Sequence, residues 1–526
     1  MWTSGWRGVA WGRLGEPWDL IIVGGGITGA GMLAEAARLG LRAVLFEARD
    51  FASGTSSRSS KLVHGGLRYL KQAQFHLTIE SVREREGLMR ESGGLVAPLD
   101  LYMASFYGDR TSHLVFKIGL SLYDIIARKR DHRRYDADDV MSRVPSLSGS
   151  KLRLAYHYHD GQTDDARLVL RTLREASLRG AVALSYANVE KLLRRVDGRV
   201  AGVAVRDAVT GRTAEVQAKI VVNATGAWAD ALRGDLGAKP ALRKIRGSHL
   251  VFSSQRLPLP AGITMMHPRD SRAVFCVPWD GVTLVGTTDV DHGSSLADEP
   301  SISAPEAEYL LELAQHAFPS LGLTMADVRA TYAGVRPVVD TGAKNPTKES
   351  REHVLWNEQG LFTVTGGKLT TFRRMARDAL KALRKELSIP KPDGGLLFTP
   401  TPLAEAFPAL LRLGPDTARR LLARYGPDAP GVAALEGADE AIGDTLTTWA
   451  ELRQAARAEG VVHLSDLLLR RVRLGVLAEN GGQALLPRIR ATIAGELGWD
   501  DARWAAEEAA YRATWEACYS SPSRRS

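Results

Sequence analysis

Residues 20–50 read LIIVGGGITGAGMLAEAARLGLRAVLFEARD, in which two apolar runs flank a glycine-rich turn and an Ala-rich segment. The run DLIIV at residues 19–23 is short and rich in branched side chains, which is typical of a buried parallel strand. The Ala and Leu residues that follow favour a helix ending at Gly40, and RAVLFE at residues 42–47 is a second buried strand. The order and length predict one complete βαβ unit of about 30 residues.

The turn between the first strand and the helix has the spacing of a phosphate-binding loop. Gly24, Gly26 and Gly29 form G-x-G-x-x-G. In this pattern the first glycine allows a tight turn, the second lets the backbone approach a pyrophosphate, and the third allows close helix–strand packing. The phosphates would meet free N–H groups at the positive end of the helix dipole. Glu47 ends the next strand, where it can bond a ribose hydroxyl and repel a 2′-phosphate. The unit therefore predicts FAD or NAD rather than NADP.

Two later segments favour FAD over NAD. VVNATGAW at residues 221–228 is a strand that ends in a turn of small residues, and TVTGGKLTT at residues 363–371 places two glycines at the start of a long helix. The positive end of that helix dipole would face whatever lies in front of it. Because a reduced flavin gains negative charge on its pyrimidine ring, such a helix start would stabilise the reduced cofactor. We therefore predict FAD.

The composition is that of a globular protein with several domains. Of the 526 residues, 44% are hydrophobic and 25% are charged, as in ordinary globular proteins. A chain of this length exceeds what one hydrophobic core organises, so we expect several domains. Cys276 and Cys518 are the two cysteines, too few for a disulfide framework or a thiolate zinc site, and they suit a reducing compartment. The net charge of +9 fits an anionic partner, although an Arg-rich composition explains it equally well.

The sequence contains no segment typical of membrane insertion or secretion. No apolar run reaches the roughly 20 residues that a spanning helix needs. Residues 1–18 lack the continuous apolar core of a secretory signal, and we expect them to be a disordered leader. The protein should be intracellular, either in solution or attached to a membrane surface without crossing it.

The order of predicted elements indicates an α/β fold: an FAD-binding Rossmann-like domain with an inserted β-rich substrate domain and a helical C-terminal domain. Alternating runs at residues 196–219 and 271–291 predict two hairpins. The predicted boundaries are residues 19–95, 150–250 and 330–390 for the discontinuous FAD-binding domain, 96–149 and 251–329 for the substrate domain, and 400–526 for the helical domain.

Beyond the glycine loop, a series of motifs resembles the FAD-dependent, respiratory, quinone-linked glycerol-3-phosphate dehydrogenases. The motifs are VGGGITGAG, TSSRSSKLVHGGLRYL, DDARLVL, VVNATGAW, RGSHLVF, VGTTDVD, YAGVRPVVD and TGGKLTTFRRMA, in the family's order. The resemblance implies oxidation of sn-glycerol 3-phosphate to dihydroxyacetone phosphate by hydride transfer to flavin N5, with a membrane quinone as electron acceptor. The region after residue 400 resembles the family's C-terminal domain in its helical character, but it contains few motifs that can be compared.

This reaction requires cations for the phosphate, a base for the hydroxyl proton, and a C–H bond aimed at the flavin. By the resemblance, the substrate site contains Arg68, Tyr69, Arg336, Arg351 and Lys368. Arg336 is the preferred phosphate or carbinol ligand because its planar guanidinium can donate two parallel hydrogen bonds.

Two histidines compete for the role of base, because a neutral imidazole accepts a proton near neutral pH. We prefer His249 in RGSH as the base, with Arg336 as the other catalytic residue. His64 in KLVHGG is predicted to be a flavin neighbour. A purely structural role is the alternative for each histidine.

The predicted cofactor contacts come from the glycine loop, the strand-end carboxylate, the segment before HGG, one strand and two later turns. They are Gly24, Gly26, Ile27, Thr28, Gly29, Glu47, Ser56, Ser57, Lys61, Leu62, His64, Gly65, Val189, Thr225, Gly226, Trp228, Gly367, Lys368, Leu369 and Thr370.

YHYHDG places His157 and His159 on one face of a predicted strand, as a metal pair would require. The sequence supplies no convincing further ligand. We interpret the pair as structural and expect no metal.

A lipid-soluble quinone would bring the enzyme to the bilayer. In the apolar segment 113–127, Lys117, Ser121 and Asp124 form a polar stripe at helical spacing that continues to Arg128, and a basic tail follows. This fits a helix at an anionic membrane surface, and equally a helix packed in the substrate domain. The implied location is the cytoplasm, peripherally attached to the inner face of the cell membrane. A homodimer is compatible with the sequence.

Three other functions are compatible with parts of the sequence. An oxidase would pass the electrons to oxygen, and no residue distinguishes it from the dehydrogenase. An amino-acid or amine oxidase of similar fold would use an arginine for a carboxylate, whereas several cations here favour a phosphate. An RNA-associated flavoprotein would need a basic groove with stacking aromatics, which the sequence does not show, so we expect no nucleic-acid partner.

Overall fold

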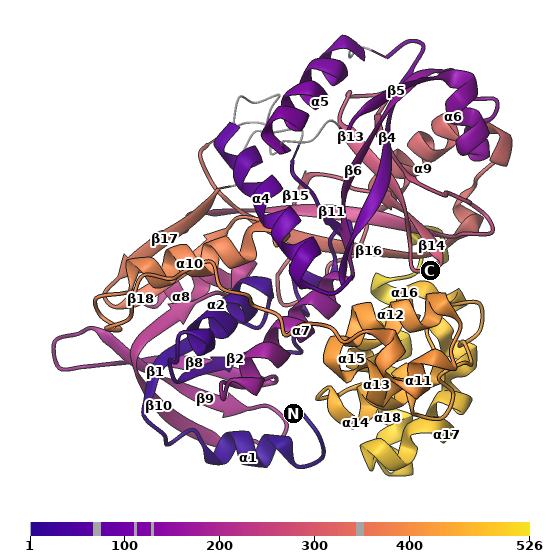
Figure 1. The fold of residues 1–526 in the computed structure, drawn as a ribbon. Coiled ribbons are helices and arrows are strands. Elements are labelled where there is room, and N and C mark those ends of the chain that lie inside the picture. The colour runs from indigo at the N-terminus through magenta and orange to yellow at the C-terminus, as the bar shows by residue number, and fades with distance from the viewer. Residues whose placement is uncertain (1, 67–74, 110–112, 128–130, 343–351, 526) are drawn as a thin grey trace.

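Two β-sheets and a helical domain make up the protein (Figure 1). The computed structural model describes residues 2–66, 75–109, 113–127, 131–342 and 352–525. Within these residues, no helix is long and apolar enough to cross a membrane.

The first sheet contains the predicted βαβ unit. Its strand order is β17-β18-β10-β1-β2-β7, and β9 and β8 continue from β10 as an antiparallel extension. The core strands β18, β10, β1, β2 and β7 run parallel. The strands are β1 (Trp18–Val23), β2 (Ala43–Phe46), β7 (Val182–Leu184), β8 (Ala187–Arg194), β9 (Val200–Asp207), β10 (Thr213–Asn223), β17 (His353–Glu358) and β18 (Leu361–Gly366).

Both faces of this sheet are covered, which explains the unbroken apolar run in β1. Leu20 and Ile22 pack into a core with helices α2 (Ile27–Arg38), α7 (Asp165–Leu178) and α10 (Phe372–Ala382). Ile21 and Val23 face the opposite core, beneath the β8–β9–β10 hairpins. The hairpin predicted at residues 196–219 is confirmed as the antiparallel pair β9–β10.

The expectation that residues 1–18 are disordered is wrong. Helix α1 (Trp6–Gly12) follows a buried Trp2. Arg7 donates hydrogen bonds to the carbonyl of Ser185 and to Asp207, both at 2.6 Å. The aromatic side chains of this segment therefore cover apolar surface of the first domain instead of remaining in solvent.

The second sheet has the order β15-β11-β14-β13-β12-β4-β6-β3, with β16 beside β11 and β5 beside β6. The hairpin predicted at residues 271–291 is confirmed as β13–β14. The strands are β3 (Leu62–Val63), β4 (Val96–Phe106), β5 (Arg133–Asp136), β6 (Leu152–Thr163), β11 (Leu242–Ser253), β12 (Gly262–Met266), β13 (Ala273–Trp279), β14 (Val282–Gly286), β15 (Val290–Asp291) and β16 (Val328–Val339).

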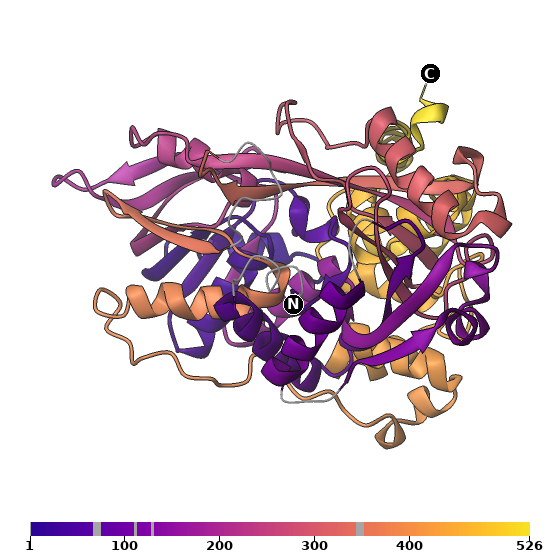
Figure 2. The same ribbon diagram turned by 90° about the horizontal axis from the view of Figure 1, so that it is seen from above.

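The predicted domain boundaries need correction at this sheet. Strands β6, β11 and β16 were placed wholly or mainly in the FAD-binding domain, yet they pair with β4, β14 and each other in the second sheet. All three strands therefore belong to the second sheet. Helices α4 (Phe75–Glu91), α5 (His113–Ala127), α6 (Ala137–Arg143) and α9 (Ala304–Ala317) lie around this sheet (Figures 1 and 2).

The C-terminal region is helical, as predicted, and forms a separate group beside the first sheet (Figure 1). Its core includes Trp504, Tyr511 and Trp515. The helices are α11 (Pro408–Leu411), α12 (Pro415–Tyr425), α13 (Ala429–Ala433), α14 (Trp449–Ala458), α15 (Leu464–Asp466), α16 (Leu474–Leu477), α17 (Leu486–Leu497) and α18 (Asp501–Cys518).

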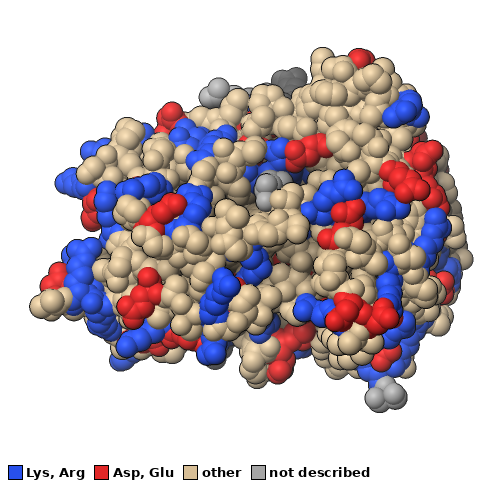
Figure 3. Space-filling model, turned by 90° about the horizontal axis from the view of Figure 1, so that it is seen from below, with Lys and Arg blue, Asp and Glu red and all other residues tan. Residues whose placement is uncertain are grey.

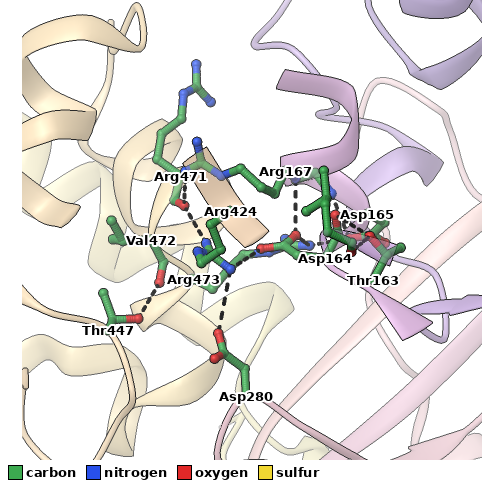
Figure 4. Close-up of polar contacts among 12 residues, drawn as sticks. Thr163, Asp164, Asp165, Arg167, Asp280, Arg424, Thr447, Arg471, Val472 and Arg473 are labelled. Carbon is green, nitrogen blue, oxygen red and sulfur yellow. Dashed lines mark hydrogen bonds and ion pairs between the residues drawn. The ribbon is translucent and has the colours of Figure 1, made fainter. Parts of the chain in front are cut away.

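A buried charge cluster joins this helical domain to the start of α7 (Figure 4). Asp164 accepts hydrogen bonds from Arg424 at 3.0 Å and from Arg473 at 3.2 Å. Although burial raises the pKa of Asp164, these guanidinium groups lower it below its ordinary value. Asp165 contacts Arg473 and also Lys61 Nζ, the latter at 2.8 Å. The cluster therefore connects the C-terminal domain to the segment that contains Lys61.

Tyr519, the residue that follows helix α18, makes a second link between distant segments of the chain. Arg58 Nη2 donates to Tyr519 Oη at 3.4 Å, and Arg58 also pairs with Glu299. Tyr519 Oη in turn donates to Glu299 at 2.7 Å. The buried Arg58 is thus held from two distant parts of the chain.

Candidate active site

A cavity of about 850 Å³ is lined by residues of both sheets. Its walls include the glycine loop, residues 53–56 and 58–60, the turn at residues 366–370, and one side of α5. The segments that the sequence places far apart but predicts to share a cofactor therefore meet around one space.

The glycine loop has the geometry that its spacing predicts. Gly24 has φ +111°, a conformation that favours glycine, and a Cβ there would lie 2.6 Å from the carbonyl oxygen of Ala224. A Cβ on Gly29 would overlap the carbonyl oxygen of Gly24. Helix α2 begins at Ile27, whose N–H donates to Ser56 Oγ at 2.9 Å. The loop thus presents backbone to the cavity at a helix N-terminus.

Glu47 lines the cavity at the end of β2. Its carboxylate accepts the N–H of Gly25 at 2.6 Å and that of Arg49 at 2.8 Å. Burial raises the pKa of Glu47 above its ordinary value. Glu47 therefore holds the glycine loop in place, and its predicted contact with a ribose stays a prediction.

The turn before α10 also reaches the cavity. Gly366 and Gly367 both have positive φ angles, +75° and +69°. A Cβ on Gly367 would overlap the side chain of Met375. Lys368 lines the cavity and donates to Ser81 Oγ of α4 at 3.0 Å. The turn thus places backbone N–H groups and one ammonium at the wall, as the sequence predicts.

Arg336 lines the cavity from β16. Its Nη1 donates to Asp289 Oδ1 at 2.9 Å and its Nη2 to Thr287 Oγ1 at 3.0 Å. A Cβ at position 247 would overlap the guanidinium, so Gly247 on the neighbouring strand makes room for it. The side chain is held in one orientation, which suits directional binding of an anion.

His249 is buried on β11 and does not line the cavity. Its Nε2 lies 2.9 Å from Ser60 Oγ, and Ser60 does line the cavity. Burial first, and then the charges of Arg336 and Lys61, hold the pKa of His249 well below its ordinary value. Among the described residues, His249 Nδ1 has no hydrogen-bond partner. The imidazole is therefore neutral and meets the cavity through Ser60.

Most of the predicted site residues meet at this cavity. Those that line it are Gly24, Gly26, Ile27, Thr28, Glu47, Ser56, Leu62, His64, Val189, Thr225, Gly226, Trp228, Arg336, Gly367, Lys368, Leu369 and Thr370. Those that lie outside its lining are Gly29, Ser57, Lys61, Gly65 and His249. Arg68, Tyr69 and Arg351 fall outside the described residues.

There are physical reasons why some predicted site residues do not line the cavity. Lys61 is buried and donates to Asp165 and to the carbonyl of Ser57, both at 2.8 Å, so its ammonium is directed away from a cofactor. Gly65 donates its N–H to Asp160 at 3.0 Å, and a Cβ there would overlap Tyr123. Lys61 and Gly65 therefore support the cavity wall without lining the cavity.

The sequence reasoning assigned no role to several residues of the wall. Ser60 and Asp289 lie within quoted motifs, SSRSSKL and VGTTDVD, which was the available signal. Arg272 donates to the carbonyl of Thr287, and nothing in its local sequence marks it. Further wall residues of this kind are Arg49, Arg58, Asp160, Thr264, Met266 and Phe275.

Helix α5 packs against the second sheet through Phe116 and Leu120, which is one of the two arrangements that its sequence allows. Asp124 of the expected polar stripe is buried and accepts from Asp131 N at 3.1 Å and His132 Nδ1 at 2.7 Å. Leu114 and Ile125, which do not line the cavity, are 55% and 73% exposed, and Lys117 of the expected stripe is exposed as well. Asp124 departs from this exposed set because its carboxylate binds the segment that follows the helix.

Comparison with known proteins identifies the class. Residues 19–373 match the family described as FAD dependent oxidoreductase, and residues 372–504 match the C-terminal domain of alpha-glycerophosphate oxidase. A Bacillus halodurans glycerol-3-phosphate dehydrogenase complexed with FAD has the same fold, with TM-score 0.79 and 28% identity over 98% of both chains.

Curated relatives show which group of FAD-dependent oxidoreductases the chain belongs to. "Glycerol-3-phosphate dehydrogenase 2" of Mycobacterium tuberculosis is 35% identical over 97% of this chain and 90% of that protein. "Aerobic glycerol-3-phosphate dehydrogenase" of Bacillus subtilis is 37% identical over 73% of this chain and 69% of that protein. The chain therefore belongs to the family of FAD-dependent glycerol-3-phosphate dehydrogenases, as its motifs predict, and its cofactor is FAD.

The residues present fit this cofactor. Gly24 and Gly26 line the cavity beside the start of α2, and a side chain at Gly24 would meet backbone. Gly367 and Lys368 line the same cavity at the second helix start. An L-α-glycerophosphate oxidase of Mycoplasma pneumoniae with FAD bound shares the fold at 19% identity, with TM-score 0.58 over 74% of this chain and 100% of that one.

Proposed function

We propose that the protein oxidises sn-glycerol 3-phosphate to dihydroxyacetone phosphate and passes the electrons to a membrane quinone. Its family supports the substrate, because the curated relatives are named glycerol-3-phosphate dehydrogenases. The observation that carries the proposal is the fixed guanidinium of Arg336 at the wall of a cavity that also contains the glycine loop.

The chain's own residues have distinct roles in this proposal. FAD, when bound, accepts the hydride at N5. Arg336 binds the phosphate or the carbinol oxygen, and Lys368 adds a positive charge at the same wall. His249 is the base: Ser60 takes the hydroxyl proton and gives its own to His249 Nε2, so the proton leaves along the 2.9 Å contact. The predicted substrate contacts of Arg68, Tyr69 and Arg351 remain part of the proposal.

The neutral state of His249 fits this role. A base must be unprotonated before the reaction, and its lowered pKa ensures this at neutral pH. The same lowered pKa makes the imidazolium more acidic than that of an ordinary histidine, so the proton is released again after the reaction.

Anaerobic mixing of the purified flavoprotein with sn-glycerol 3-phosphate tests the reaction. We expect the oxidised-flavin absorption band to bleach, and glycerol without phosphate to leave it unchanged. A band that persists in excess glycerol phosphate contradicts the proposal.

The electron acceptor needs its own measurement, because an oxidase would reduce the flavin equally well. With glycerol phosphate present, we expect a soluble quinone analogue to reoxidise the flavin much faster than air-saturated buffer does. Rapid oxygen uptake with hydrogen peroxide formation would show an oxidase instead.

We propose that α5 is the part of the protein that contacts the membrane. Leu114 and Ile125 are exposed on it and do not line the cavity, while Phe116 and Leu120 are buried beneath. Residues 115, 116, 118, 119, 120 and 122 line the cavity. A single helix thus has exposed apolar residues and a side that lines the cofactor space, which suits a lipid-soluble acceptor.

Vesicle binding tests this placement. We expect the wild type to sediment with phosphatidylglycerol vesicles and Leu114→Ser/Ile125→Ser to sediment less, with unchanged dye-linked activity. Leu403→Ser/Leu411→Ser is the matched control, because both leucines are equally exposed on the C-terminal domain. Equal sedimentation of all three proteins contradicts the proposal. The cytoplasmic location at the inner face of the membrane and a homodimer stay predictions.

The charge distribution gives no support to an RNA partner. On the face shown in Figure 3, Lys and Arg side chains lie among Asp and Glu side chains, without a continuous basic groove. Arginines such as Arg424 and Arg473 pair internally with Asp164, so their charge does not form an exposed basic surface.

A further inference from the structure

We propose that Asp100, His157 and His159 form a binding site for a divalent metal ion of the zinc class. Asp100 Oδ1 lies 2.7 Å from His157 Nε2 and 3.0 Å from His159 Nε2. The three ligand atoms all lie within 4.8 Å of one another. Two imidazole nitrogens and a carboxylate oxygen therefore converge on one point outside the flavin cavity, which none of these residues lines.

The fold fixes this arrangement through strand register. Asp100 on β4 lies directly opposite His159 on the antiparallel strand β6, and His157 is two residues away on the same face. The β4–β6 pairing extends along the whole of β4, from Val96 to Phe106. Ligands on a rigid strand pair are held near their binding positions before the metal arrives, which lowers the cost of binding.

A second carboxylate orients one of the histidines. Asp131 Oδ1 lies 2.6 Å from His159 Nδ1, and Asp131 also accepts the N–H of His159 at 3.2 Å. With the Nδ1 proton donated to Asp131, the lone pair of His159 Nε2 points toward Asp100. Metal-ligating histidines usually have such a carboxylate or carbonyl partner at the other nitrogen.

The ligand set selects the class of metal. Imidazole nitrogens suit zinc and similar transition metals, whereas magnesium and calcium prefer oxygen ligands throughout. Bonds of about 2.0–2.1 Å to tetrahedral zinc separate ligand atoms by about 3.3 Å, so small movements complete the site. Side-chain exposure of 58% for Asp100 and 42% for His159 leaves room for water as a fourth ligand.

The site is connected to α5 through Asp131. Asp124, near the end of α5, accepts the N–H of Asp131 at 3.1 Å. A metal at the site would fix His159 and, through it, the segment that anchors this end of α5. This differs from the sequence-based expectation of a structural histidine pair. The strand register supplies Asp100 and the segment before β5 supplies Asp131, and the motif alone shows neither carboxylate.

Zinc titration of the tag-free, chelator-treated holoenzyme tests the site. We expect calorimetry to show one saturable equivalent of Zn²⁺ and no heat from Mg²⁺. His157→Gln/His159→Gln should lose that equivalent, and Asp100→Asn should weaken it at least tenfold. Asp131→Asn should weaken it by about 10–100-fold, as expected for a residue that orients a ligand. His76→Gln, an exposed histidine on α4, is the matched control and should bind as the wild type does.

Two outcomes would overturn the proposal: no saturable Zn²⁺ binding by the wild type in the micromolar range, or the same stoichiometry in the double variant. Flavin content and circular dichroism show whether each variant folds. A second readout is thermal stability, which should rise with Zn²⁺ in the wild type and in His76→Gln but not in the double variant.

Discussion

The imidazole of His249 lies flat against the ring of Tyr332, with 4.6 Å between the ring centroids and 15° between the planes. The two residues are cross-strand neighbours on β11 and β16. Tyr332 also donates its hydroxyl proton to the carbonyl of Ser59 at 2.9 Å. One side chain therefore aligns both the histidine and the segment that carries Ser60.

Tyr332→Phe should lower kcat with little change in KM. The substitution keeps the stacked ring and removes only the bond to Ser59, so the loss should lie between a few-fold and about tenfold, as for one net hydrogen bond. Stopped-flow flavin reduction measures it, and Tyr332→Leu, which also removes the stacking, should be slower still. Unchanged rates in Tyr332→Phe would show that the segment is held in place without this bond.

His249→Gln should lower the rate of flavin reduction by about 10²–10⁴-fold, the usual contribution of a general base. Substrate affinity should stay near normal, because His249 does not line the cavity. His267→Gln is the matched control, since His267 is also buried and stacked on a tyrosine, Tyr309. If both variants reduce flavin at the wild-type rate, the base lies elsewhere.

The rate should depend little on pH near neutrality. The ordinary pKa of a histidine is 6.5, and that of His249 is well below this value. We expect the rate of flavin reduction to stay constant from about pH 8 to about pH 6 and to fall only in more acidic buffer. A midpoint near the ordinary value would mean that solvent reaches the imidazole.

The lowered pKa of His249 also predicts how the stability of the protein depends on pH. Between the lowered pKa and 6.5 the unfolded chain binds more protons at His249 than the folded protein does. Its contribution to the free energy of unfolding is therefore complete above pH 6.5 and is lost as the pH falls toward the lowered value, by up to about 1.4 kcal/mol per pH unit. His249→Gln should be less sensitive to acid over this range in urea unfolding.

Arg336→Lys should raise KM for glycerol phosphate at least tenfold while flavin content stays normal. Lysine keeps the charge but cannot contact Asp289 and Thr287 while also presenting two parallel donors. The expected loss is about 1.5–3 kcal/mol, typical of a hydrogen bond to a charged group. Arg419→Lys, at an exposed arginine, is the control, and an unchanged KM in Arg336→Lys would remove Arg336 from the substrate site.

Gly29→Ala should abolish flavin binding, because the added methyl group overlaps the carbonyl oxygen of Gly24 and backbone cannot move aside cheaply. Gly495→Ala is the control: it lies within α17, has nothing within 4 Å of the added Cβ, and should be slightly stabilising. The ratio of flavin to protein absorbance reports both. Full flavin content in Gly29→Ala would contradict the packing role of this glycine.

The βαβ unit was predictable because its signals are local: strand, loop, helix and Glu47 follow one another within 30 residues. The contact of His249 with Ser60 joins residues 189 positions apart and depends on how β11 and the segment near β3 are placed. The domain boundaries failed for the same reason, since β6, β11 and β16 pair with distant strands of the second sheet. The position of Asp100 beside His157 and His159 required the register of β4 and β6.

The contact between Arg58 and Tyr519 spans 461 positions. During synthesis on the ribosome, Arg58 emerges shortly after the glycine loop, but Tyr519, which secures the wall beside it, emerges 461 residues later. We expect the nascent polypeptide to acquire its flavin only when Tyr519 has emerged. A prematurely terminated product would then accumulate as apoprotein, even with its dinucleotide-binding sequence intact.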